Sequence, residues 1–94
     1  MSGAVEHEVE RHRFVARFPE GEGELVYRRT ATGALDLLHT GVDPRLRRRG
    51  IGESLVRAAL GYARANRLQV IPTCPFVARW LEKHPGERDL VASH

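Results

Sequence analysis

The chain has 94 residues, of which 41% are hydrophobic and 29% are charged. This composition is typical of a single globular domain and excludes a disordered chain or a collagen-like repeat. The formal net charge is only +3, yet four arginines lie between positions 45 and 49. Such a local excess indicates one anionic ligand held at one point. It argues against nucleic acid as a partner, because nucleic-acid-binding proteins usually spread basic residues over a whole face.

Several other classes of protein are excluded by what the sequence lacks. No apolar run approaches the roughly 18 residues that a membrane span requires, so no membrane partner is expected. The N-terminal segment has no apolar stretch typical of a secretory signal, and the single cysteine, Cys74, leaves no internal disulfide. We therefore expect a cytoplasmic protein. The histidines do not have the spacing of metal ligands, so no metal site is expected.

The first half of the chain predicts three strands. Residues 1–11 are polar and are expected to form a flexible N-terminal segment ahead of one domain over residues 12–94. Alternating apolar residues predict strands over residues 12–18, 24–30 and 35–42, with turn sequences between them. In the third strand, the alternation predicts two sets of side chains that face opposite sides of the sheet. One set is Leu38, Thr40 and Val42, and the other is Leu37, His39 and Gly41.

The second half predicts two helices and at least one more strand. Apolar residues recur at helical spacing over residues 51–66 and over residues 75–83. Residues 68–71 form a short apolar strand between the helices, and residues 90–91 are a candidate edge strand. The order β-β-β-α-β-α predicts an α/β fold with a mixed sheet of four or five strands. The strand after the first helix is expected to run parallel to the strand before it.

The strongest functional signal is the sequence Arg47-Arg48-Arg49-Gly50-Ile51-Gly52, which stands between a strand and the long helix. The start of a helix leaves backbone N–H groups without partners and carries partial positive charge. Glycines let a phosphate approach this backbone closely, and arginines add bidentate donors. The segment therefore predicts a pyrophosphate site. It is neither a nucleotide-triphosphatase P-loop nor a dinucleotide fingerprint, because the Lys-Ser/Thr pair and the G-x-G-x-x-G spacing are missing.

The segment from Val42 to Gly52 resembles the acetyl-CoA-binding segment of the GNAT N-acetyltransferase superfamily. In that family a strand ending in V-x-P is followed by Q/R-x-x-G-x-G/A and a helix, and Arg47, Gly50 and Gly52 stand at the matching positions. A small single-domain subfamily shares three further motifs with this chain. They are His39-Thr40, Pro72-Thr73-Cys74-Pro75-Phe76 and His84-Pro85. The resemblance covers residues 25–91.

The resemblance implies a truncated GNAT fold and an N-acetyltransferase activity. The implied acyl donor is acetyl-CoA or another acyl-CoA, and the implied acceptor is a small-molecule or protein amine. The residues implied to contact the donor lie on the third strand, in the arginine-glycine segment and at the start of the last helix. They are Thr40, Gly41, Val42, Arg47, Arg48, Arg49, Gly50, Ile51, Gly52, Glu53, Pro75 and Phe76.

Two residues are candidates for the catalytic step. Cys74 precedes Pro75, and proline is favoured at the first position of a helix, so Cys74 is expected at an N-cap, where the helix dipole lowers a thiol pKa. The tyrosine that most GNAT enzymes carry on the last helix is missing here, which makes Cys74 a candidate acid. A transient acyl carrier and a buried structural cysteine are the alternatives. His39 is a candidate base for the acceptor amine, with a hydrogen-bonded structural role as the alternative.

A second function stays open, that of an acyl-CoA-binding module with little or no transferase activity. Gly41 stands where the subfamily usually carries a glutamate. The chain also lacks the helices that build the acceptor pocket in longer GNAT enzymes. A homodimer is one way in which so small a chain would complete such a pocket.

Overall fold

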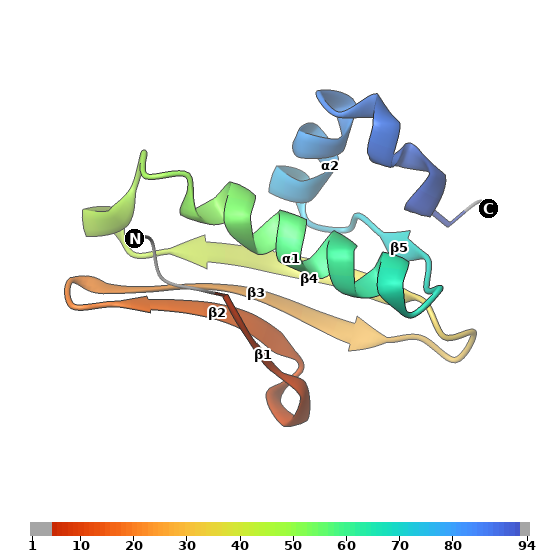
Figure 1. Ribbon diagram of the computed structural model, residues 1–94, viewed down its shortest axis with the longest axis horizontal. Helices are drawn as coiled ribbons and strands as arrows, with labels where there is room; N and C mark the ends of the chain where they lie inside the picture. Colours follow the sequence, from red (N-terminus) through yellow and green to blue (C-terminus); the bar gives the residue numbers. More distant parts are fainter. Residues whose placement is uncertain (1–4, 93–94) are drawn as a thin grey trace.

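The protein is described by a computed structural model that covers residues 5–92 as five strands and two α-helices, with three short 3₁₀ segments. The strands form one sheet in the order β1-β2-β3-β4-β5, and α1 runs along one face of it (Figure 1). In chain order the elements are β1 (Glu6–Glu8), η1 (Val9–Arg11), β2 (Arg13–Phe18), β3 (Gly21–Arg29), β4 (Leu35–Val42), η2 (Pro44–Leu46), α1 (Ile51–Ala65), β5 (Val70–Ile71), α2 (Pro75–Glu82) and η3 (Pro85–Leu90).

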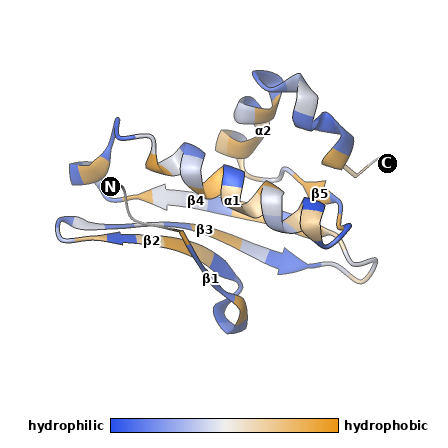
Figure 2. Cartoon of the chain, viewed as in Figure 1, coloured by the Kyte–Doolittle hydropathy of each residue, from blue (hydrophilic) through white to orange (hydrophobic). Residues whose placement is uncertain are grey.

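The predicted α/β fold with a mixed sheet is confirmed. Strands β1 to β4 pair antiparallel, and β4 pairs with β5 in parallel after the α1 crossover. Hydrophobic and hydrophilic residues alternate along α1 (Figure 2), and its apolar stripe packs on the sheet. Leu55, Val56 and Ala59 of α1 are fully buried there with Leu25 and Leu37 of the strands. Burial of this stripe contributes to the hydrophobic stabilisation of the fold.

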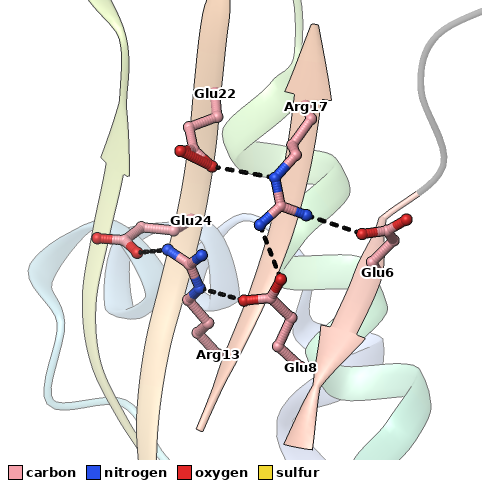
Figure 3. A network of polar contacts seen from close by, with 6 residues as sticks. All are labelled: Glu6, Glu8, Arg13, Arg17, Glu22 and Glu24. Carbon is pink, nitrogen blue, oxygen red and sulfur yellow. Dashed lines mark hydrogen bonds and ion pairs between the residues drawn. The ribbon is translucent and has the colours of Figure 1, made fainter. Parts of the chain in front are cut away.

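The expectation of a flexible segment over residues 1–11 is wrong for residues 6–11, while residues 1–4 lie outside the described part of the chain. Strand β1 pairs with β2, and charged side chains join the two strands. Glu8 accepts from Arg13 at 2.6 Å and from Arg17 at 2.7 Å, and Glu6 accepts from Arg17 at 2.9 Å (Figure 3). Polar residues therefore form an ordered strand here, because each carboxylate finds an arginine on the neighbouring strand.

The predicted facing of the third strand is wrong because β4 contains a bulge. Leu37 lies opposite Tyr27 and Thr40 lies opposite Leu25, whereas Leu38 has no partner on β3. Both partners belong to the core on the α1 side. Leu37 and Thr40 consequently face the same side of the sheet, although simple alternation placed them on opposite sides. One extra residue in one strand is what a bulge inserts, and it reverses the facing beyond it.

Strand β5 is shorter than the predicted strand over residues 68–71. As a result, the second half of β4 has no neighbouring strand on that side. Strand β5 pairs with β4 only through Val70 and Ile71, and the last backbone hydrogen bond between the two described segments runs from the Cys74 N–H to the Leu37 carbonyl at 2.8 Å. Beyond that bond β4 continues to Val42 while the other segment turns into α2. The predicted edge strand at residues 90–91 is reduced to a single parallel bridge between Val91 and Val70.

Candidate functional site

A cavity of about 570 Å³ lies where the end of β4 meets the loop after it and the first turns of α1 and α2. Its wall combines strand, loop and helix residues that are distant in the sequence. They are His39, Thr40, Gly41, Val42, Leu46, Arg47, Arg48, Gly50, Ile51, Gly52, Glu53 and Phe76. The structure thus brings most of the predicted donor-contacting residues and His39 together around one space. Arg49, Cys74 and Pro75 are not part of this wall.

The start of α1 presents unpaired backbone donors to the cavity. The first backbone bond of the helix runs from the Ser54 N–H to the Gly50 carbonyl at 3.0 Å. Helix geometry therefore leaves the N–H groups of Ile51, Gly52 and Glu53 without helical partners. Gly50 is the N-cap, and it has no side chain that would satisfy these donors. Its φ of 74° lies in the left-handed region, which glycine adopts at little cost.

The four neighbouring arginines have different surroundings. Arg45 is paired with Asp43 at 3.1 Å, and Arg49 lies 3.5 Å from a carboxylate oxygen of Glu20. Arg47 and Arg48 line the cavity and, among the described residues, neither has a carboxylate within ion-pair distance. Two guanidinium groups are thus left to meet an anion at the same place as the helix donors. We call Arg47, Arg48, Gly50, Ile51 and Gly52 the anion cradle.

Gly52 leaves room for the Phe76 ring of α2. A Cβ atom added at this position would lie 2.8 Å from Cζ of Phe76, a distance that real structures do not show. The Phe76 ring belongs to the first turn of α2 and is 36% exposed, which is high for a large apolar side chain. It forms an apolar wall beside the anion cradle. Pro75 begins the helix but lies outside the wall.

The end of β4 supplies the opposite wall. Asp43 donates its N–H to the Glu22 carbonyl of β3 at 3.1 Å. Because N–H directions alternate along a strand, the Val42 N–H points to the other edge of β4, toward the cavity. His39 is exposed, and its Nε2 atom lies 3.1 Å from where a Cβ of Gly41 would be. The imidazole therefore covers the space that a side chain at position 41 would fill.

Cys74 lies behind the wall and is only 4% exposed. It is the N-cap residue of α2, as predicted, and its Sγ donates to Thr40 Oγ1 at 3.5 Å. Burial acts to raise the pKa of the thiol, but hydrogen bonding with Thr40 and with the backbone of Val77 and Phe76 outweighs it. The pKa of Cys74 is consequently held below its ordinary value. The thiol therefore does not line the cavity itself, but it contacts Thr40, which does.

Comparison with known proteins identifies the family. Residues 13–90 match the family of GCN5-related N-acetyltransferases. The chain belongs to this family. The chain is 30% identical over 83 residues to Protein NATD1 from Gallus gallus and to Protein NATD1 from Homo sapiens. The matched residues cover 86% of this chain, 76% of the Gallus gallus protein and 74% of the Homo sapiens protein. A GCN5-like protein from Staphylococcus aureus, solved by NMR, has a similar fold, with a TM-score of 0.77, 25% identity and coverage of 99% of this chain and 91% of that one.

One wall residue of this GCN5-related domain was missed by sequence reasoning. Leu46 is fully buried, and it anchors the loop between β4 and the anion cradle. The signal was present, because Leu46 is the apolar residue inside a run of arginines. In residues 5–92 we find no group of three or more His, Cys, Asp or Glu side chains that could hold a metal ion. No helix in the described range is long and apolar enough to cross a membrane.

Proposed function

We propose that this chain binds acetyl-CoA in the cavity beside β4 and transfers the acetyl group to the amine of a small molecule or protein. The observation that carries the proposal is the meeting of two unpaired arginines with the uncapped start of α1. Helix N–H groups and guanidinium groups are both strong donors to phosphate oxygens. The pyrophosphate of the donor would lie in the anion cradle. The uncharged pantetheine portion of acetyl-CoA would then run along the free edge of β4.

The acetyl transfer follows from the groups along that edge. The nitrogen of the acceptor amine attacks the thioester carbonyl carbon, a C–N bond forms and the C–S bond breaks. The Val42 N–H would donate to the carbonyl oxygen as negative charge develops on it. His39, exposed at the cavity, would accept the proton that the amine loses. The departing CoA thiolate takes a proton from Cys74 or from water. Holding both reactants in one cavity would supply much of the rate gain.

A second candidate is an acyl-CoA-binding module without significant turnover. The burial of Cys74 behind Thr40 favours it, because a buried thiol reaches the leaving sulfur only if the site rearranges. Residues 75–83 contain no tyrosine that would replace it as an acid. The two candidates share the donor site and differ in the chemical step. Steady-state assays of thiol release with a panel of primary amines separate them.

The donor site is tested by calorimetric titration of acetyl-CoA into the wild type, Gly52→Val and Gly61→Val. Both glycines lie in α1, but a Cβ at Gly61 meets open space. Gly61→Val therefore controls for the cost of valine in a helix. We expect the wild type and Gly61→Val to bind alike, and Gly52→Val to bind at least about tenfold more weakly. Absence of binding to the wild type would refute both candidates.

The arginines provide a second matched pair. Arg47→Ala removes a guanidinium that lines the cavity, whereas Arg45→Ala removes one that is paired with Asp43 outside it. We expect Arg47→Ala to weaken acetyl-CoA binding about five- to tenfold, because a charged hydrogen bond to phosphate is lost. Arg45→Ala should change the affinity little. Equal losses in the two variants would indicate only a general effect of positive charge.

A further inference from the structure

Glu53 occupies a position from which it would compete with the proposed ligand. It lies three residues after the N-cap Gly50 in α1. A glutamate at this third position ordinarily reaches back to the N-cap N–H, as in a capping box. Such a contact would place a carboxylate among the donors of the anion cradle. The structure shows a different arrangement.

Arg57, one helical turn further along α1, holds the Glu53 carboxylate instead. Its Nε and Nη2 atoms donate to Glu53 Oε2 at 3.1 and 2.9 Å. The Arg57 guanidinium holds the pKa of Glu53 below its usual value, so the carboxylate is charged at neutral pH. Glu53 still lines the cavity. Its charge is therefore turned away from the helix start rather than removed from the site.

Trp80 of α2 completes this arrangement. The Arg57 Cζ atom lies 5.3 Å from the centroid of the indole, within the range of a cation–π contact. His84 stacks on the same indole, with 3.7 Å between ring centroids and 11° between planes. The buried indole N–H has no hydrogen-bond partner among the described residues. Trp80 also helps to lower the pKa of the Glu53 carboxyl, after the larger effect of Arg57. Trp80 thus packs against Arg57, the partner of Glu53.

We propose that Arg57 and Trp80 are positioning residues that keep the Glu53 carboxylate out of the anion cradle, and thereby set the affinity for a phosphate-bearing acyl donor. The proposal rests on the proposed function, because it concerns the same cavity. If Glu53 were released, it would reach back to the Gly50 N–H, as in a capping box, and its carboxylate would lie beside the N–H groups that a pyrophosphate needs. Its negative charge would also repel the phosphates. The two effects act in the same direction.

The proposal predicts a rescue. Arg57→Gln keeps most of the side-chain length and removes the charge, and it should weaken the binding of coenzyme A, measured by calorimetry, by about tenfold. The double variant Glu53→Gln, Arg57→Gln should return to within about twofold of the wild type, since no charged competitor remains.

Trp80→Phe keeps a ring but loses the N–H, and it should weaken the binding of coenzyme A by a smaller factor than Arg57→Gln does. Arg64→Gln is the matched control, because Arg64 lies in the last turn of the same helix and its ion pairs are with Glu87 and Asp89 of η3, away from the cavity.

Hydrogen exchange of the Gly50 amide tests the same proposal without any ligand. Release of Glu53 in Arg57→Gln should slow the exchange of this N–H, because the carboxylate caps it, and the double variant should restore the faster rate. A double variant that binds coenzyme A as weakly as Arg57→Gln, or a Gly50 exchange rate equal in the two, would overturn the inference. If the wild type fails to bind coenzyme A, the proposed function fails, and the exchange measurement still decides whether Arg57 restrains Glu53.

Discussion

The thiol of Cys74 shows how one neighbouring side chain can set the chemistry of a residue. Burial alone would raise its pKa, and the hydrogen bond with Thr40 is the largest of the effects that lower it. We predict that Thr40→Val raises the pKa of Cys74, as measured by the ultraviolet absorbance of the thiolate against pH. Because the chain has one cysteine, the signal has a single source.

Thr73→Val is the control for this measurement. Thr73 directly precedes Cys74 in sequence, but its hydroxyl donates to Asp36 instead. The thiol pKa should therefore stay at its wild-type value in this variant. An equal rise in both variants would mean that the packing around the thiol, rather than the Thr40 hydroxyl, controls its titration.

The surroundings of a single residue could be predicted where they depend on its neighbours in the sequence. The position of Cys74 at the start of α2 follows from the proline after it, and the structure confirms that position. Its contact with Thr40 was out of reach of the sequence, because the bulge at Leu38 decides which face Thr40 occupies. The approach of Trp80 to Glu53 was likewise hidden. It depends on how two helices cross, which no spacing within either helix records.

Among the elements, β1 depends on a half-buried histidine. His7 stacks on Phe14 with 4.1 Å between centroids, and its Nε2 lies 2.6 Å from the Tyr27 hydroxyl. Tyr62 of α1 packs edge-on against the same ring. Burial among these rings lowers the pKa of His7. The β1 strand is therefore held by an imidazole whose charged form is disfavoured by its surroundings.

This burial predicts a loss of stability in mild acid. The pKa of His7 in the folded state lies below the value of about 6.5 in an unfolded chain, so the unfolded state binds more protons as the pH falls. The stability should decrease between about pH 7 and pH 5. In His7→Phe, which keeps the stacking, this decrease in the melting temperature should be smaller.

The carboxylate of Glu8 titrates in a separate range. Hydrogen bonds from Arg17 and Arg13 lower its pKa to about 2. Its contribution to stability is therefore present above the unfolded value and is lost only as the pH falls from about 4.5 toward 2. A loss between pH 7 and pH 5 that persists in His7→Phe would contradict the assignment to His7.

The elements differ in how clearly the sequence indicates them. The bounds of β4 were predicted correctly, because it is long and apolar and ends at Asp43-Pro44. Strand β1 was missed, because Glu-His-Glu has no apolar residue and gains its order from arginines on β2. Strand β5 was predicted two residues too long. Leu68 instead donates its N–H to the Ala63 carbonyl at the end of α1.

The whole molecule has one sheet with two unlike faces. One face carries the core against α1, whereas the other carries the arginine–glutamate network of β1 to β3 (Figure 3). Val15 lies on this second face, opposite Glu6 and Glu24, and it is fully buried although it does not belong to the core cluster. The stems of long charged side chains can cover apolar surface in this way.

Because the two faces differ, we predict that removing buried methyl groups lowers the free energy of unfolding by different amounts on each face. Leu55→Ala leaves a cavity in the rigid core and should lower the free energy of unfolding by about 2–5 kcal/mol. Val15→Ala should cost about 1.5 kcal/mol or less, because fewer carbons are lost and the flexible stems of Arg13 and Arg17 can close over the gap. Denaturant unfolding measures both values. If Val15→Ala costs as much as Leu55→Ala, the charged network is as rigid as the core, and the outer face must be counted as a second packed layer of the fold.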